Sequence, residues 1–323
     1  MLPNEHFTQF IRQAGLVLAV LASPLGLLPL GLEISSPAQS RSEVLNIGYI
    51  ESAFYDLRVK DAQVALEMWG SSLINHETSP LNKVSAIIIP TFEELERAVT
   101  NEELDVVIMG TVDYLKLAKS GLLEPVLAPQ PRPDCMQNYL LLVRKDRGIG
   151  ELGQLKNGRL VCVLGGEGDL PKIWLDNSLF KAGRGGAETF FKEIKYVDKA
   201  AQAVLPVFFK QADVCLATER SFNSLKELNP QVGSELSILA TSPNLLRGLI
   251  CFRKSRDQAE KKRTYDVMSK IHEDPQGQQI LLLFHEERLA PFRPDYLETA
   301  QALREEYERN RAENERAKKG NIP

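Results

Sequence analysis

Residues 193–221, EIKYVDKAAQAVLPVFFKQADVCLATERS, contain two apolar strands separated by a helix. The first strand is EIKYV, and Asp198 after it is a favourable N-cap for the helix. The second strand is DVCLA, and another helix begins near Thr218. Strand and helix alternation with apolar strands is typical of parallel-type sheets covered by helices on both faces. This stretch therefore predicts an α/β fold.

The same alternation continues on both sides of this stretch. Further strands are predicted at 44–50, 84–90, 104–110, 138–146, 159–164, 237–240 and 245–252. Helices are predicted at 56–76, from a capping box at 91–94, at 111–119, at 170–182 and over most of 256–318. These strands are too many for one small sheet and fall into two groups. The charged end, 295–318, is expected to be a solvated helix, with a docking helix for a partner as the alternative.

The first forty residues differ from the rest of the chain. Residues 14–31 carry no charge, Arg12 lies just before them, and Ala38-Gln39-Ser40 supplies small residues after them. A basic start, an apolar stretch and small residues at a cleavage point predict a secretory signal peptide over 1–40. An uncleaved membrane anchor is the alternative, although two prolines interrupt the apolar run.

Composition limits the classes of function. The chain has 323 residues, of which 43% are hydrophobic and 25% charged, so it can fill two lobes. The net charge of −4 includes no basic block that would favour nucleic acid. The four cysteines form no CxxC pair, so zinc is not predicted. Buried free thiols and disulfides both remain open for them, with free thiols favoured.

Several segments resemble a known family. They are LNIGYIESAF (45–54), ELDVVIMGTVDYL (103–115), NYLLLVRKD (138–146), IGELGQLKNGRLVCV (149–163), LLRGLICFRK (245–254) and the long block 196–243. In this order they resemble the periplasmic phosphate, phosphite and phosphonate-binding proteins of ABC importers, over most of 44–290.

The resemblance implies a two-lobed α/β fold of the type II periplasmic-binding-protein class, with a ligand cleft between the lobes. Lobe 1 would be discontinuous, formed by 41–134 plus 241–323, and lobe 2 would be 135–240. Two crossings, near 138–139 and 241–243, would form the hinge of a closing motion.

The function implied is that of an extracytoplasmic solute-binding protein. It would be a monomer that binds one small polar, phosphonate-like ligand. Its partners would be an ABC permease and ATPase in the membrane, with no cofactor and no metal. The alternative is a periplasmic ligand sensor that partners a membrane receptor kinase. An enzyme is not predicted, because HExxH and GxSxG motifs are absent from the sequence and Cys162 and Cys215 lie within strands.

Candidate ligand-binding residues follow the carboxyl ends of predicted strands, where ligands bind in such folds, except Tyr139, which lies at the first crossing. They are Glu51, Ser52, Tyr55, Gly110, Thr111, Tyr139, Gly166, Glu167, Gly168, Thr218, Glu219 and Arg220. Each has a structural alternative: an exposed loop for the first three, a helix cap for Thr111, hinge packing for Tyr139 and a surface ion pair for Arg220. Asp169 is favoured as an N-cap rather than as a ligand contact.

The turn at 165–169, GGEGD, departs from the hydroxyl-rich cluster that the resemblance implies for phosphorus oxygens. Backbone N–H donors remain there, but the turn fails the P-loop spacing. Side-chain type places Glu51, Glu167, Asp169 and Glu219 against Arg220 in the predicted cleft. This balance favours a zwitterion with an amine, or a neutral polar molecule, over a simple dianion.

Overall fold

The computed structural model describes residues 43–53, 59–75, 81–130, 135–163, 169–197, 199–284 and 286–320. The predicted signal peptide over 1–40 and the N-cap at Asp198 lie outside these residues. No helix among the described residues has the length and apolar character needed to span a bilayer.

The first of two large sheets contains six strands in the order β13-β4-β12-β3-β1-β2. Their bounds are β1 Glu43–Ile50, β2 Leu81–Ile89, β3 Val106–Gly110, β4 Leu123–Gln130, β12 Gly248–Arg253 and β13 Arg288–Pro291. Strands β1, β2 and β3 pair in parallel, whereas β12 pairs antiparallel with both β3 and β4. Strand β12 is far from β3 in the sequence, so the sheet joins two distant parts of the chain.

The second sheet contains five strands in the order β10-β6-β9-β7-β8. Their bounds are β6 Tyr139–Arg144, β7 Arg159–Val163, β8 Glu193–Val197, β9 Val214–Thr218 and β10 Leu236–Thr241. Strand β7 pairs in parallel with β8 and β9, and β6 lies antiparallel between β9 and β10. Both sheets are therefore mixed, and the expectation of parallel-type sheets holds only for their βαβ portions. The strands β4 and β13 were not predicted from the sequence.

Two short strands connect the sheets. Strand β5, Met136–Gln137, pairs antiparallel with β11, Leu245–Leu246. Next to them, the Tyr139 N–H donates to Ser242 Oγ at 2.8 Å, and the Ser242 N–H donates to Tyr139 O at 2.8 Å. The two connecting segments therefore hold each other through backbone hydrogen bonds and through the Ser242 hydroxyl.

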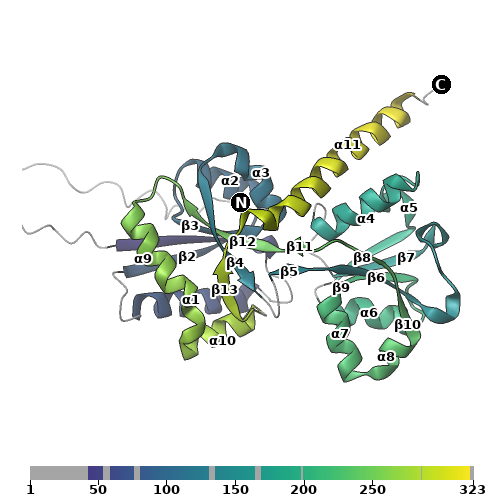
Figure 1. Cartoon of the computed structure of the whole chain (residues 1–323), viewed down its shortest axis with the longest axis horizontal. Coiled ribbons are helices and arrows are strands. Elements are labelled where there is room, and N and C mark those ends of the chain that lie inside the picture. Colours follow the sequence, from purple (N-terminus) through teal and green to yellow (C-terminus); the bar gives the residue numbers. More distant parts are fainter. Residues whose placement is uncertain are drawn as a thin grey trace, which may run out of the picture. The chain divides into compact units, whose positions relative to one another are not determined.

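Helices cover both sheets (Figure 1). They are α1 Val59–Asn75, α2 Phe92–Thr100, α3 Thr111–Leu117, α4 Leu170–Lys181, α5 Ala187–Phe190, α6 Ala200–Phe208, α7 Glu219–Leu228, α8 Pro230–Glu235, α9 Gln258–Ser269, α10 Pro275–Leu283 and α11 Glu298–Gly320. The predicted cap at Thr91 is confirmed, because its side chain accepts a hydrogen bond from the Glu94 N–H. Thr218 caps α7 in the same way. Gly121 and Gly183 end their helices with left-handed backbone, which glycine adopts readily.

The C-terminal helix α11 is not solvated along its whole length. Ala300 and Leu303 are buried in the hydrophobic core of the five-stranded sheet. The buried Asn177 of α4 donates to Leu303 O at 2.8 Å and accepts from Asn310 at 3.1 Å. Figure 1 shows α11 running beside α4. The expectation of a fully solvated helix is thus wrong for the first half of α11, because its apolar positions pack against α4.

An aspartate precedes the central strand of each sheet and repeats the same local arrangement. Asp105 donates its N–H to Asn46 O at 2.8 Å, and its Oδ2 accepts from the Asn46 N–H at 2.9 Å. Asp213 donates its N–H to Arg159 O and accepts the Arg159 N–H on Oδ2 at 2.7 Å. Each carboxylate therefore fixes the start of a neighbouring parallel strand.

Asp105 and Asp213 pair with arginines that differ in burial. The loss of unfolding free energy on neutralising each aspartate is therefore expected to differ. Asp105 pairs with Arg253 and with Arg256, whose side chain is 4% exposed. Asp213 pairs with Arg147 and Arg159, which are 44% and 37% exposed. We expect Asp105→Asn to lower the free energy of unfolding by about 3–5 kcal/mol, because the buried Arg256 guanidinium loses the carboxylate at 2.7 Å and keeps the more distant Glu260 at 3.4 Å. The matched variant Asp213→Asn is expected to lose only about 1 kcal/mol. Urea unfolding of both variants checks this, and equal losses would contradict it.

Candidate functional site

A small cavity brings together residues that belong to both large sheets. It is lined by Ser52, Gly110, Thr111, Val112, Asp113, Tyr139, Asp169, Leu170, Pro171 and Arg247, and we call it the cleft. Its free volume is about 20 Å³. A water molecule needs roughly 10–15 Å³ on this measure, so the cleft as it stands has room for about one.

Arg247 owes its position to the start of α3. The Thr111 hydroxyl donates to Leu246 O at 2.7 Å, and the Thr111 N–H donates to Arg247 O at 3.0 Å. Gly248 follows directly, and a Cβ at that position would lie 2.8 Å from the Met109 carbonyl oxygen. Only glycine therefore lets β12 approach β3 this closely. These contacts hold the backbone of Arg247 at the edge of the cleft.

Tyr139 and Asp169 form the wall that belongs to the five-stranded sheet. The Tyr139 hydroxyl accepts a hydrogen bond from Gln137 at 2.7 Å. Burial raises the pKa of Tyr139, while Arg247 acts in the opposite direction and Asp169 raises it further. Arg247 and Asp169 are thus both electrostatic neighbours of this hydroxyl. Asp169 occupies the N-cap position of α4, but its side chain makes no capping hydrogen bond.

Asp113 and Ser52 lie on the opposite wall and contact each other. The Ser52 hydroxyl donates to Asp113 Oδ2 at 3.3 Å. Lys116 donates to Asp113 Oδ1 at 3.1 Å, so this carboxylate is already paired with a cation. The cleft therefore offers hydroxyl groups, two carboxylates and one guanidinium among its lining residues.

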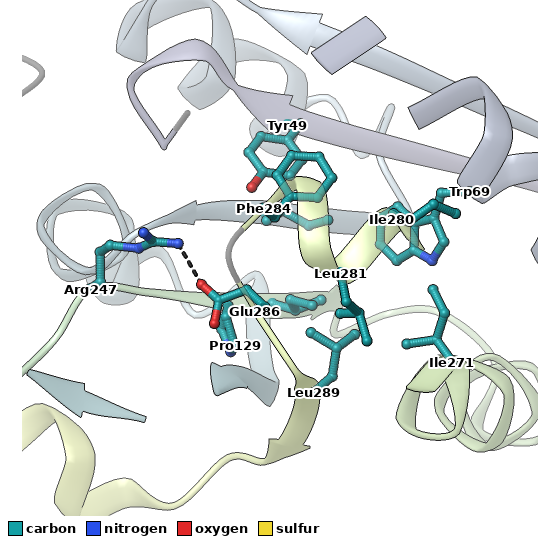
Figure 2. A pocket seen from close by; sticks show the side chains of 12 residues that line it. Tyr49, Trp69, Pro129, Arg247, Ile271, Ile280, Leu281, Phe284, Glu286 and Leu289 are labelled. Carbon is teal, nitrogen blue, oxygen red and sulfur yellow. Dashed lines mark hydrogen bonds and ion pairs between the residues drawn. The ribbon is translucent and has the colours of Figure 1, made fainter. Parts of the chain in front are cut away.

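A second cavity lies on the other side of Arg247, and Figure 2 shows it from close by. Its walls are Tyr49, Trp69, Ile108, Pro129, Arg247, Ile250, Ile271, Ile280, Leu281, Phe284, Glu286 and Leu289, and its volume is about 50 Å³. We call it the apolar cavity. The rings of Tyr49 and Phe284 stack with centroids 5.7 Å apart. Arg247 lines both the cleft and this cavity.

Arg247 and Glu286 form an ion pair at one end of the apolar cavity (Figure 2). The Arg247 guanidinium donates to Glu286 Oε1 at 2.5 Å. The Glu286 side chain is 4% exposed, and its second oxygen has no hydrogen-bond partner among the described residues. Burial raises the pKa of Glu286 to about 7, although the neighbouring Arg247 and Arg220 lower it. Glu286 is therefore a carboxyl group that titrates near neutral pH.

The predicted site residues fall into three groups in the structure. Ser52, Gly110, Thr111 and Tyr139 line the cleft. Glu51, Thr218, Glu219 and Arg220 are not among its lining residues. The remaining four, Tyr55, Gly166, Glu167 and Gly168, lie outside the described residues.

Local hydrogen bonds explain why the second group stays out of the cleft wall. Thr218 accepts from the Ser221 N–H as the N-cap of α7. The Glu219 N–H donates to Asn138 O at 3.0 Å, and the Glu219 and Arg220 side chains are exposed. Arg220 nevertheless lies close enough to Glu286 to influence its pKa.

Sequence reasoning missed Arg247, Glu286 and Asp113. Arg247 stands inside LLRGLICF, which the periodicity assigns to one continuous strand. The structure divides it into β11 and β12, with Arg247 between them. The Arg-Gly step in an otherwise apolar run was the signal that could have identified this break. Glu286 had no such signal, because only the fold places it beside Arg247.

Neither metal nor thiol chemistry is indicated by the described residues. Within the described ranges, no three His, Cys, Asp or Glu side chains come together as a set that could hold a metal ion. Cys135, Cys162, Cys215 and Cys251 are all buried and free. The favoured expectation of buried free thiols agrees with this state.

Comparisons with known proteins were made for the whole chain. Residues 75–297 match the family model described as "ABC transporter, phosphonate, periplasmic substrate-binding protein". A search of curated proteins gives no match.

Solved structures share the fold at low sequence identity. A binding protein component of an ABC phosphonate transporter from Pseudomonas aeruginosa has a TM-score of 0.61 and 16% identity, covering 84% of this chain and 89% of its own. PhnD1 from Prochlorococcus marinus in complex with methylphosphonate has a TM-score of 0.59 and 14% identity, covering 83% and 98%. A Xanthomonas citri protein bound to ATP has a TM-score of 0.60 and 18% identity, covering 83% and 98%. These similarities establish the fold of this chain, which is that of the type II periplasmic binding proteins.

The raised pKa of Glu286 predicts a pH dependence of stability. The folded state holds the Glu286 proton up to about pH 7, whereas the unfolded state releases it near the ordinary value of 4.5. The folded state therefore loses stability as the pH rises through this window. Relative to Glu286→Gln, we expect the wild-type protein to lose about 2–3 kcal/mol of unfolding free energy between pH 5 and pH 8. Urea unfolding at both pH values measures this difference.

The exposed neighbour Glu287 supplies the control for this prediction. Glu287→Gln is expected to show the same pH dependence as the wild-type protein. If the stability of Glu286→Gln changed with pH in parallel with the wild type, Glu286 could not be the buried carboxyl group whose pKa is about 7.

Proposed function

Since this chain belongs to the family of periplasmic substrate-binding proteins of ABC phosphonate transporters, we propose that its cleft binds a small phosphonate-type oxyanion. Membership of this family makes the chain a solute-binding component of an ABC importer. The observation that carries the ligand proposal is the position of Arg247, which lines both the cleft and the apolar cavity and whose charge acts on the Tyr139 hydroxyl. A guanidinium presents a fork of N–H donors that matches phosphonate oxygens.

Further donors support an oxyanion in the cleft. The first turn of α4 contributes Leu170 to the lining, and helix starts present N–H groups to anions, while Pro171 beside it supplies no N–H. The hydroxyl groups of Ser52 and Tyr139 line the same space. Asp113 is already paired with Lys116, which reduces its repulsion of an anion. An amine-bearing zwitterion remains a competing ligand class because Asp169 lines the cleft as well.

The proposed binding involves movement of two lobes. Lobe 1 would comprise 41–134 plus 241–323 and lobe 2 would comprise 135–240, a division that follows the two sheets except that α11 packs in the core of the five-stranded sheet. A cleft with room for about one water molecule admits a solute only when its walls separate. The paired segments β5 and β11 connect the two sheets, and we place the hinge there.

The importer role also defines the partners and the compartment. The family implies a small-molecule ligand and a membrane permease, and it is periplasmic. We propose that residues 1–40 act as the signal peptide for export, that an ATPase drives the permease, and that the binding protein acts as a monomer without a cofactor. The comparisons give no support to the alternative of a sensor that reports to a membrane kinase.

A ligand panel tests the proposed function. Isothermal titration of the purified protein with phosphate, phosphite, methylphosphonate, 2-aminoethylphosphonate and α-amino acids is expected to give heat of binding with the phosphonates. Small-angle scattering with and without methylphosphonate is expected to show a smaller radius of gyration in its presence. Binding of amino acids alone would contradict the proposed ligand class.

Arg247→Lys tests the role of the guanidinium fork. Lysine keeps the positive charge beside Glu286 but loses bidentate donation, so we expect methylphosphonate to bind about 10- to 100-fold more weakly. The matched variant Arg288→Lys changes an exposed arginine that hydrogen-bonds Gln130 away from the cleft. It is expected to bind like the wild type. An Arg247→Lys variant with unchanged affinity would remove Arg247 from the binding site.

A further inference from the structure

We infer that the apolar cavity is a second subsite, which takes a short alkyl substituent of two or three carbons carried by the anionic ligand. This inference rests on the proposed function, because it needs the anionic head of that ligand on Arg247. It adds to that function the substituent that the protein selects.

The walls of the cavity are suited to carbon. Most of the lining residues are aliphatic or aromatic, and they come from both the sheet and the helices packed on it. Figure 2 shows Leu281, Leu289 and Ile271 on one side of the space and the Tyr49 and Phe284 rings on another. Burial of apolar ligand surface against such walls is favourable and does not depend on direction.

Arg247 connects this cavity with the cleft. It lines both spaces, so a ligand head on its guanidinium stands at the entrance of the apolar cavity. A guanidinium presents five N–H donors in a fork and can serve more than one acceptor. Arg247 bonds Glu286 and also lines the cleft, so a phosphonate oxygen in the cleft lies next to the same side chain.

The surroundings favour an alkyl substituent over an aminoalkyl one. Glu286, the carboxylate at the cavity, is already paired with Arg247, and Arg220 also lies near it. An ammonium group entering this space would lose its hydration among apolar walls, with only the second Glu286 oxygen to accept its N–H groups. A methyl or methylene group does not meet this cost.

The volume of the cavity sets the length of the substituent. An engineered apolar cavity of about 150 Å³ in another protein holds benzene, which has six carbons. On that scale the 50 Å³ of this cavity holds two carbons, or three if the chain begins in the entrance. Longer chains would have to extend into the packed core or back into solvent.

A homologous series of phosphonates tests the inference in the wild-type protein. We expect the dissociation constant to fall about fourfold for each added methylene from methyl- to propylphosphonate, or about fifteenfold in total. Hexylphosphonate is expected to bind no more tightly than propylphosphonate, and 2-aminoethylphosphonate more weakly. Isothermal titration supplies each constant.

Two variants of Leu281 change the cavity from inside. Leu281→Phe fills the space and is expected to bring the propyl-to-methyl affinity ratio to about one. Leu281→Ala enlarges the space and is expected to move the optimum to a longer chain, such as the hexyl compound. The adjacent Leu282 is 71% exposed and outside the cavity lining, so Leu282→Phe should keep the wild-type ratio. Thermal unfolding confirms that each variant is folded.

The outcomes separate this inference from the proposed function. Methylphosphonate binding without any gain for ethyl or propyl overturns the subsite and leaves the proposed function standing. A propyl-to-methyl affinity ratio that stays at the wild-type value in Leu281→Phe overturns the subsite as well. Tighter binding of 2-aminoethyl- than of propylphosphonate overturns its apolar character. No binding of any phosphonate overturns the inference together with the proposed function.

Discussion

The two hydrogen bonds from Thr111 to the segment 246–247 are the constraint on which the site depends. They join the start of α3 to the chain between β11 and β12, which is far away in the sequence. Because Gly248 permits β12 to lie close against β3, Arg247 can project from the edge of the sheet rather than from within it. Without this local arrangement the guanidinium would belong to a strand, and the cleft would lose its cation.

Two buried carboxylates, those of Asp105 and Glu286, differ in how completely their neighbours compensate the negative charge. Asp105 accepts a backbone N–H and pairs with two arginines, so its charge is well compensated and fixes three strands relative to one another. Glu286 has one strong partner and one oxygen without a partner among the described residues. Burial raises its pKa, the two arginines offset this only in part, and the result costs stability at neutral pH. It is the kind of local cost that proteins retain at binding sites.

The C-terminal helix α11 adds a link between the two sheets beyond the two crossings expected from the sequence. The chain leaves the six-stranded sheet after β13, yet Ala300 and Leu303 of α11 are buried in the core of the five-stranded sheet. Asn177 adds buried hydrogen bonds between α4 and α11. A movement of one sheet against the other must therefore carry α11 with the second sheet, so the segment before α11 acts as a third connection.

The sequence by itself determined the α/β class, most of the helices and the grouping of strands into two sheets, because apolar periodicity and caps are local properties. It also identified Gly110, Thr111 and Tyr139 as residues at strand ends near the cleft. The antiparallel insertion of β12, the strands β4 and β13, and the pairing of Arg247 with Glu286 were decided only by the tertiary structure. These features depend on contacts between residues far apart in the chain, and no local pattern encodes which distant partner a strand or a charge will meet.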